Sequence, residues 1–300
     1  NMKKFKAFIV VLLASLVLSA CSSAPEEATT KVLRVAAPGD VLTLDSVLAT
    51  DGFSFEVISA FQEDLVIYAA DDTVIPGVAT DWTVSEDGKE YVFNLDPNAK
   101  WSNGDPVTAN DFVFAWRRLA DPATAAEYAI MLQTAHVLNA ADITAGNKAK
   151  EELGVEAVDD KTLKVSLDTA VPYFLQLMTF PVFLPQNEAF FTAQGSAYAT
   201  GPDGLLSNGP FKLTEWVQGS LISSVKNPEY AHADEVKIDG VEWKIIAESQ
   251  TIKLEYEQDN LDVAAMTGDL VEAYNGSEDF TQILKGYVWY LPFNQGSDNP

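Results

Sequence analysis

One stretch of the sequence, residues 75–118, limits most strongly how this chain can fold. It reads IPGVATDWTVSEDGKEYVFNLDPNAKWSNGDPVTANDFVFAWRR. Turn-forming residues interrupt it at 76–77 (Pro-Gly), at 87–88 (Asp-Gly) and at 103–106 (Asn-Gly-Asp-Pro), and each of these favours a change of direction. Between the second and third turns, residues 91–95 have the composition of a strand. We therefore expect a strand, a turn and then a helix.

The helix at the end of this stretch has clear start and stop signals. Thr108 can cap its first turn, with Asp111 three residues later as a weaker form of the capping box. Basic residues at 117–118 suit the negative end of the helix dipole, and Asp-Pro at 121–122 ends the helix. Its apolar residues recur at i, i+3, i+4 and i+7 and therefore share one face: Phe112, Ala115, Trp116 and Leu119.

The acidic balance of the chain excludes some classes of partner. The 300 residues include 44 Asp and Glu but only 19 Lys and Arg, which gives a net charge of −25. Binding to nucleic acid requires a surface patch of Lys and Arg side chains, and binding to an anionic lipid surface favours the same residues. We therefore expect no nucleic-acid partner, and we interpret the acidity as keeping an exported protein soluble. The length suggests two lobes or more.

The N-terminal residues predict export and a lipid anchor. Lysines at positions 3, 4 and 6 precede an apolar segment, 7–18, that is short for a bilayer span. Leu-Ser-Ala-Cys at 18–21 looks like a bacterial lipobox, so residues 1–20 would be a lipoprotein signal peptide and Cys21 would carry the lipid. The alternative is a plain secretory signal with a chance cysteine. Residues 21–31 are small and polar, and we expect a flexible tether there.

The rest of the chain predicts further strands and helices. A helix is predicted over 54–65 with Ser54 as its cap, after a loop at 50–53. Residues 180–185 contain two prolines, which favours a buried crossover over a long helix. Strands are predicted at 32–36, 155–158, 161–167, 221–226 and 236–246.

Several segments together resemble a known family. PGVATDW, DGKEYVFNL, AKWSNGDPVTANDF and VFAWRR are similar to motifs of the extracytoplasmic solute-binding proteins (family 5) that serve peptide ABC importers, most of all to the oligopeptide-binding branch. SNGPFKL at 207–213 and NPEY at 227–230 match as well. Two positions depart from the family pattern: Ser46 replaces a proline, and Asn260 stands in a turn that is normally rich in glycine.

The resemblance implies a fold. It implies the α/β periplasmic-binding-protein class that has an extra subdomain, with mixed β-sheets and two lobes. Family members are considerably longer than this chain, so we expect 32–300 to be an N-terminal lobe and the second lobe to be missing or truncated. The extra subdomain would occupy about residues 66–190, inserted between parts of the first lobe. The resemblance also implies a helix over 121–138 and a strand that starts near Phe211.

The resemblance further implies a set of ligand-binding residues. The main chain of Asp51, Gly52 and Phe53 would pair with a peptide main chain, as an added strand does. Tyr128 would line the peptide cleft. Four more positions match residues that approach the ligand in the family: Ala265, Met266, Tyr290 and Asn294. Without the resemblance, the sequence favours an ordinary glycine loop at 51–53, and Tyr128 could be a core or rim residue.

The implied function is binding without a reaction. The protein would be an extracytoplasmic monomer held to the bacterial membrane by lipid on Cys21, binding extended oligopeptides and delivering them to an ABC permease and its ATPase. Dipeptides, a nickel complex or another solute are alternative ligands for the same fold. Alternatives from other classes are a secreted hydrolase that uses acidic residues and a surface adhesin or sensor.

A search for catalytic and metal-binding motifs supports the non-enzymatic interpretation. The two histidines, His136 and His232, are far apart in sequence, and Cys21 is the single cysteine. There is no Gly-x-Ser-x-Gly elbow, Walker loop or dinucleotide fingerprint. Acid pairs at 71–72 and 159–160 occur in turn-like sequence. We therefore expect no catalytic residue, no metal and no cofactor.

Overall fold

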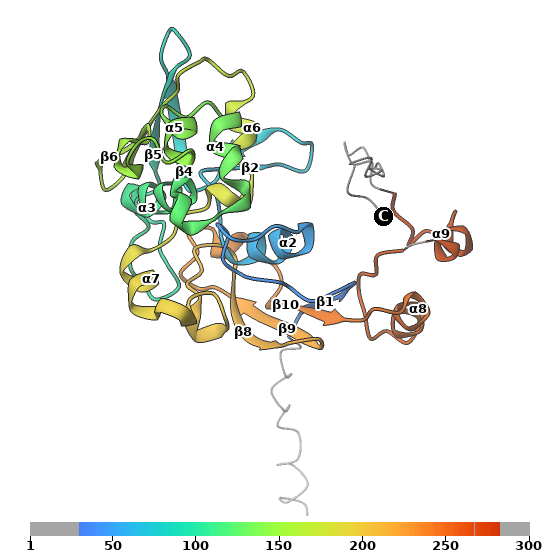
Figure 1. Ribbon diagram of the computed structural model, residues 1–300. Helices are drawn as coiled ribbons and strands as arrows, with labels where there is room; N and C mark the ends of the chain where they lie inside the picture. Colours follow the sequence, from blue (N-terminus) through green and yellow to red (C-terminus); the bar gives the residue numbers. More distant parts are fainter. Residues whose placement is uncertain (1–29, 267, 283–300) are drawn as a thin grey trace, which may run out of the picture.

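The computed structural model describes residues 30–266 and 268–282 (Figure 1). Its strands are β1 (Val32–Ala37), β2 (Val66–Tyr68), β3 (Val74–Pro76), β4 (Ala79–Val84), β5 (Glu90–Leu95), β6 (Val155–Asp159), β7 (Thr162–Ser166), β8 (Phe211–Val217), β9 (Leu221–Lys226) and β10 (Gly240–Ile245). Its α-helices are α2 (Gly52–Phe61), α3 (Ala109–Ala120), α4 (Ile130–Thr134), α5 (Ala140–Thr144), α6 (Phe174–Leu177), α7 (Glu188–Gln194), α8 (Ser249–Glu257) and α9 (Asp269–Tyr274). Short 3-10 helices include η1 (Pro122–Thr124), η2 (Glu127–Ala129) and η4 (Pro181–Phe183).

The strands form two four-stranded sheets and one two-stranded ribbon. The first sheet has the order β1-β10-β9-β8, in which β1 and β10 run parallel and the other pairs are antiparallel. The second sheet, β4-β5-β7-β6, is antiparallel throughout, and β2 pairs with β3. In Figure 1 the first sheet lies at the base, the second at the top, and α2 between them. The whole second sheet lies in sequence between β1 and β8.

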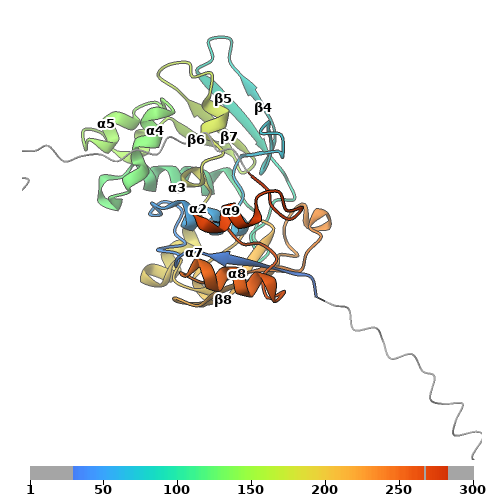
Figure 2. The same ribbon diagram turned by 90° about the vertical axis from the view of Figure 1, so that its right-hand side faces the viewer.

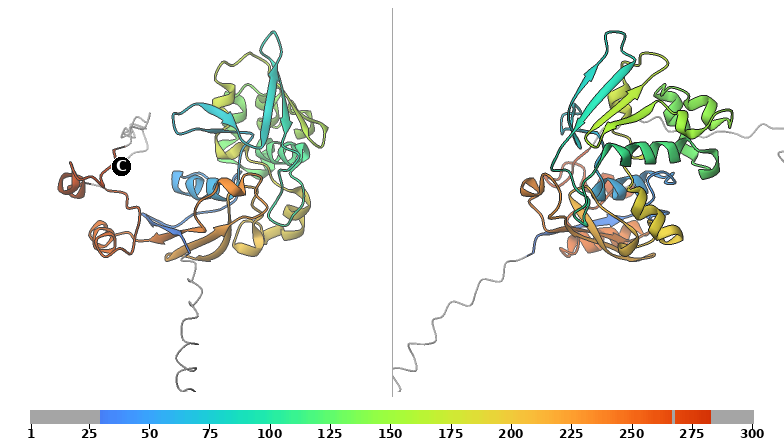
Figure 3. Two further views of the ribbon diagram at one scale, coloured as in Figure 1. Left: turned by 180° about the vertical axis from the view of Figure 1, so that it is seen from behind. Right: turned by 90° about the vertical axis from the view of Figure 1, so that its left-hand side faces the viewer.

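Helices cover the second sheet on one side. The right panel of Figure 3 shows α3, α4 and α5 beside one face of this sheet, and the other face free of helices. In contrast, α8 and α9 project from the first sheet: they lie to the right of β1 in Figure 1 and toward the viewer in Figure 2. None of the helices in the described part of the chain has the length and apolar character that a bilayer crossing requires.

The predicted helix α3 is confirmed in detail. The backbone N–H of Thr108 donates to the Asp111 carboxylate at 2.8 Å, which is the expected capping interaction. The four residues of the predicted apolar face are fully buried. Trp116 also donates its indole N–H to the carbonyl of Phe183 at 2.8 Å, which attaches α3 to the crossover that contains η4. The helix ends at Ala120, before the Asp-Pro pair, as predicted.

Most predicted strands are confirmed, but two predicted helices are wrong in extent. The strand expected from residue 236 starts only at Gly240. The helix expected over 54–65 starts at Gly52, because the Asp51 carboxylate accepts the N–H of Ser54 at 2.8 Å and caps the helix earlier. Ser54 is therefore inside the first turn, and only part of the loop expected at 50–53 exists.

The helix expected over 121–138 is broken into η1, η2 and α4. Ala125 takes a left-handed conformation with φ 53°, which ends η1, and His136 does the same with φ 55° after α4. A left-handed residue cannot continue a right-handed helix. The crossover at 180–185 is confirmed as short and buried, with only the single turn η4 in it.

One hydrophobic cluster connects the two sheets. It includes Val57, Ile58 and Phe61 from α2, the inner face of α3, and residues from β5, β7, β8 and β10. Because α2 contributes side chains to this shared cluster, its position is set by both sheets. The division into a lobe and an inserted subdomain over about 66–190 stays a prediction.

Candidate functional site

The start of α2 is the centre of the candidate site. Asp51 is extended (φ −118°, ψ 152°) and caps the helix, accepting hydrogen bonds from the backbone N–H and the hydroxyl of Ser54. The same hydroxyl oxygen accepts the N–H of Leu42 at 3.1 Å. Leu42 lies in the loop that leaves β1, so the first turn of α2 is attached to the chain just beyond the carboxyl end of β1.

This geometry changes which main-chain groups can meet a ligand. The expectation that 51–53 pairs like an added strand is wrong, because Gly52 and Phe53 are helical. Their carbonyls take part in the helix, whereas N–H groups of a first turn have no partner within the helix. The N–H groups of Gly52 and Phe53 are therefore the main-chain groups that remain for an external carbonyl.

Gly52 faces open space. It is exposed, and a Cβ added to it would meet no atom within 4 Å. Gly77 differs, because a Cβ there would lie 2.5 Å from the carbonyl oxygen of Asp64. Packing within the described residues therefore requires glycine at 77 but not at 52. The absence of a side chain at 52 leaves room for a molecule that approaches the backbone.

Tyr128, which the resemblance places in the lining of a peptide cleft, lies beside the first turn of α2. Its half-buried ring meets Phe55 edge-on at 5.5 Å between ring centroids, and Phe180 lies 5.3 Å away on the other side. Phe55 and Phe180 are 5.0 Å apart, so the three rings form one aromatic cluster. The Tyr128 hydroxyl has no hydrogen-bond partner among the described residues. It can therefore bond a ligand while its ring packs against protein.

Ala265 and Met266 lie on a different segment near the same edge. Val263 forms a parallel bridge with Val35, and its carbonyl accepts the N–H of Ala36 at 3.0 Å. The chain then continues past the carboxyl end of β1, which is where α/β folds usually bind ligands. Ala265 is exposed and Met266 half-buried. No hydrogen bond or ring contact within the described ranges connects these two residues to α2 or Tyr128.

The remaining predicted site residues cannot be placed. Tyr290, Asn294 and the lipidation residue Cys21 lie outside the described residues. Their roles stay predictions.

Sequence reasoning missed a buried polar network that holds the loop leading to α2. Arg118 donates to both carboxylate oxygens of Asp45, and Gln186 donates to Asp45 at 3.0 Å and to Ser46 at 3.1 Å. The sequence suggested only a dipole role for Arg118. Neither partner is close to it in sequence, so local pattern carried no signal for this network.

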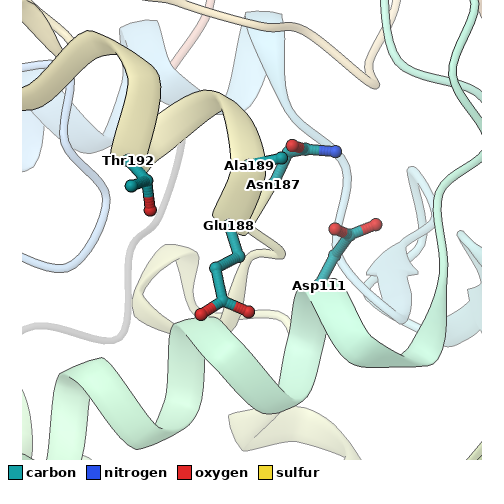
Figure 4. Close-up of a pocket in the computed structure, with 5 residues that line it drawn as sticks. All are labelled: Asp111, Asn187, Glu188, Ala189 and Thr192. Carbon is teal, nitrogen blue, oxygen red and sulfur yellow. The ribbon is translucent and has the colours of Figure 1, made fainter.

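Figure 4 shows the polar pocket between α3 and α7, with a volume of about 460 Å³. Two of its polar lining residues, Asp111 and Asn187, already serve in helix capping. Asp111 accepts the backbone N–H of Thr108 and the indole N–H of Trp101, and Asn187 accepts the N–H of Phe190 at 2.9 Å. Burial raises the pKa of Asp111. Because these groups have structural partners, the pocket is a weaker candidate than the start of α2.

Asp71 and Asp159, one from each acid pair considered for catalysis, have structural partners. Asp71 accepts from the hydroxyl of Thr73, which lowers its pKa, and Asp159 accepts from the backbone N–H of Lys161, which lowers its pKa. A general acid needs the opposite shift. Within residues 30–266 and 268–282, no group of three or more His, Cys, Asp or Glu side chains is arranged to hold a metal ion.

Comparison with known proteins identifies the family and the fold. The family model "Bacterial extracellular solute-binding proteins, family 5 Middle" matches residues 73–300. A dipeptide-binding protein of Lactococcus lactis subsp. cremoris is 32% identical over 97% of this chain and 53% of its own length. The chain thus spans about half the length of the curated relatives it matches.

Two solved structures are also similar. The substrate-binding domain of an oligopeptide ABC transporter from Bacillus anthracis str. Ames is 39% identical with a TM-score of 0.81, over 84% of this chain and 48% of that chain. Listeria monocytogenes OppA bound to peptide is 36% identical with a TM-score of 0.80, over 84% and 49%. The expected periplasmic-binding-protein fold is therefore confirmed. This chain belongs to family 5 of the bacterial extracellular solute-binding proteins.

Proposed function

We propose that this chain forms one wall of a peptide-binding site in the solute receptor of an ABC importer. The observation that carries the proposal is the similarity of its fold and sequence to an oligopeptide-binding protein solved with bound peptide. The open space at Gly52 and the free hydroxyl of Tyr128 support the same site. Binding would involve no reaction.

The residues suggest how the ligand is held. The N–H groups of Gly52 and Phe53 donate to a peptide carbonyl, and the positive end of the α2 dipole strengthens this interaction. The hydroxyl of Tyr128 makes a second polar contact while its ring forms part of the wall. Ala265 and Met266 contribute a small and an apolar surface. Main-chain contacts of this kind recognise a peptide without selecting its side chains.

The proposed location follows from the N-terminal residues. Lipid on Cys21 would hold the protein at the outer face of the bacterial membrane, and the small, polar residues 22–31 would act as a flexible tether for the folded part. The permease and ATPase of the importer would be its partners, and the receptor would act as a monomer. Mass spectrometry of the mature N-terminus tests the proposed lipid anchor. An unmodified Cys21, or cleavage at another position, would contradict it.

Calorimetry tests the ligand class. The gene product extended to the length of its relatives is titrated with peptides of two to five residues, blocked and unblocked. We expect micromolar or tighter binding of at least one peptide length, and no change of the peptide on prolonged incubation. Absence of binding for every length, or hydrolysis of the peptide that a carboxylate substitution abolishes, would contradict the proposal.

A dipeptide is the second candidate ligand. The specific observation in its favour is the dipeptide-binding relative, which matches nearly the whole chain. The same titration separates the two, because a dipeptide receptor would bind two-residue peptides at least about ten-fold more tightly, or about 1.4 kcal/mol, than peptides of four or five residues. A nickel chelate is titrated as well, because tighter binding of the chelate than of any peptide would favour the metal-complex alternative.

A further inference from the structure

A second pocket lies at the opposite end of α2 from the proposed peptide site. It has a volume of about 290 Å³ and lies between the end of α2, strand β2 and the turns near Thr179, Pro210 and Tyr230. Gln62 follows Gly52 by ten residues, and at 1.5 Å per residue the two ends of the helix are about 15 Å apart. The pocket is therefore a separate site.

The pocket is lined by two buried carboxyl groups that have almost no protein partners. Glu63 and Asp64 are each only 7% exposed. Asp64 has no hydrogen-bond donor among the described residues, and one of its oxygens is wholly buried, as is the unpartnered amide oxygen of Gln62. Glu63 accepts a single hydrogen bond, from the hydroxyl of Tyr230. No Lys or Arg within the described ranges pairs with either carboxyl group.

The backbone holds these acids in place. The side chain of Asn208 accepts the N–H of Glu63 at 3.1 Å and donates to its carbonyl at 3.0 Å. The N–H of Val78 donates to the carbonyl of Asp64 at 2.9 Å, and Gly77 packs directly against the same oxygen. These contacts fix the backbone at residues 63–64, from which both carboxyl groups extend into the pocket lining.

Two adjacent buried carboxylates without a cation are unfavourable. Burial of an unpaired charge costs several kcal/mol, so such groups either keep a proton or bind a cation. Burial raises the pKa of Glu63 and raises that of Asp64 well above its usual value, the latter also because of Glu63. The other titratable groups that act on Glu63 are Tyr230, His232 and Asp96.

The chemistry of the lining selects the kind of cation. A metal ion is disfavoured, because the described residues contain no cluster of three His, Cys, Asp or Glu side chains. Gln62, Glu63 and Asp64 supply several oxygen acceptors, and two tyrosine side chains, Tyr68 and Tyr230, supply aromatic surface. A primary ammonium has three donors and also interacts favourably with aromatic faces.

We propose that this pocket binds a primary alkylammonium group between Asp64, Glu63 and Tyr230. The group belongs either to a free alkylamine or to the side chain of a lysine residue in a peptide. Its positive charge compensates the two carboxylates, and its N–H groups satisfy oxygens that otherwise lack donors.

Calorimetric titration of the full chain tests this site. The probes are cadaverine, N-acetyl-lysine-methylamide, 1-pentanol as the neutral control and calcium chloride as the metal control. We expect both amines, or one of them, to bind with a dissociation constant below a few millimolar, and pentanol and calcium not to bind. Binding of cadaverine alone assigns a free amine, and binding of the lysine derivative assigns a peptide side chain.

Variants connect binding to the pocket. Asp64→Asn is expected to weaken amine binding at least ten-fold, and Asp71→Asn, on an exposed turn, to leave it unchanged. If Asp64→Asn does not fold by circular dichroism, Tyr230→Phe replaces it, with an expected weakening of several-fold. Because burial raises the pKa of both carboxyl groups, wild-type affinity for the amine is expected to rise with pH, and binding is expected to release protons to the buffer.

Clear results would overturn the inference. One is failure of both amines to bind at about 10 mM, a dissociation constant that corresponds to roughly 2.7 kcal/mol of binding free energy. The others are equal amine affinity of the Asp64→Asn variant and the wild type, and binding of calcium in preference to the amines. The outcome is independent of the proposed peptide function. Among the peptides used to test that function, the blocked, lysine-free ones have no ammonium group and cannot use this pocket, so they test the peptide function alone.

Discussion

The guanidinium of Arg118 on α3 donates to both oxygens of the Asp45 carboxylate, at 2.8 and 2.6 Å, although the two residues are 73 positions apart in the chain. Their side chains are only 13% and 6% exposed. Asp45 also accepts the N–H of Val47, so the pair fixes the loop between β1 and α2. The first turn of α2, with its free N–H groups, therefore depends on a contact with the helix of the second sheet.

Loss of this buried pair is expected to destabilise the fold. Asp45→Ala leaves the Arg118 charge buried without its partner, which typically lowers the free energy of unfolding by about 3–5 kcal/mol. Glu156→Ala is the control, because it removes one partner of an exposed ion pair with Lys164 and should change stability by less than about 1 kcal/mol. Urea unfolding measures both. Equal changes in the free energy of unfolding would show that the buried Asp45–Arg118 pair contributes no more stability than an exposed ion pair.

Gly52→Ala separates stability from ligand binding. The added Cβ meets no protein atom, so the free energy of unfolding should stay the same or rise by up to about 1 kcal/mol. If a ligand main chain approaches Gly52, peptide affinity should fall about ten-fold, or 1.4 kcal/mol.

The matched control for this substitution is Gly201→Ala, at another glycine whose Cβ would meet nothing within 4 Å and which is not left-handed. Calorimetry on the extended gene product measures affinity, and thermal unfolding measures stability. Unchanged peptide affinity in Gly52→Ala would show that the peptide does not bind at the start of α2.

Tyr128→Phe tests the free hydroxyl. The substitution keeps the ring contacts with Phe55 and Phe180, so stability should change by less than about 0.5 kcal/mol. Loss of one hydrogen bond to a ligand should reduce peptide affinity by about 0.5–1.5 kcal/mol, or roughly two- to ten-fold. Tyr173→Phe, at an exposed tyrosine, serves as the control. A larger loss of peptide affinity in the control than in Tyr128→Phe would contradict a contact between the Tyr128 hydroxyl and the peptide.

Asp262 provides a prediction about pH. Hydrogen bonds from the Arg34 side chain at 2.9 and 2.7 Å lower the pKa of Asp262 to about 2. Because the folded pKa lies below the unfolded value of about 3.9, the stabilisation is complete above pH 4 and is lost as the pH falls toward 2. The pair is one-third exposed, so its contribution is below about 1 kcal/mol.

The measurement for this prediction is an NMR titration of the Asp262 carboxyl carbon, together with amide exchange at Ala36, whose N–H donates to Val263. Asp262→Asn should speed exchange at Ala36 at pH 7, and this difference should shrink as the pH falls toward 2. A titration midpoint near 4 would mean that the 259–263 segment is not held by Arg34.

Local sequence signals predicted the elements whose stabilising contacts are also local. The capping residues, apolar face and Asp-Pro end of α3 lie within 15 residues, and the turn between β6 and β7 lies between two directly paired strands. The start of α2 could not be predicted in this way, because Asp51 and Ser54 are both good caps. Ser54 instead accepts the N–H of Leu42, and Asp51 takes the capping position.

The candidate site was predicted in part. The resemblance singled out both Tyr128 and residues 51–53, and the structure brings Tyr128 next to Phe55 in the first turn of α2, a contact that spans 73 residues and has no local pattern; their role in binding stays a prediction. It did not indicate that Gly52 and Phe53 are helical, which changes the main-chain groups they offer. The acids at 63–64 were not singled out, because only packing against Asn208, Tyr230 and Gly77 makes them buried.

The sequence by itself determined the family, the position of most strands and the helix α3, because turn residues, caps and apolar periodicity act over a few neighbouring residues. The tertiary structure alone decided which polar groups are buried and which remain free. Arg118 meets Asp45, whereas the hydroxyl of Tyr128 and the carboxyl group of Asp64 find no hydrogen-bond partner within residues 30–266 and 268–282. The physical reason is that burial and pairing depend on contacts between residues far apart in the chain, which appear only when the two sheets pack around α2.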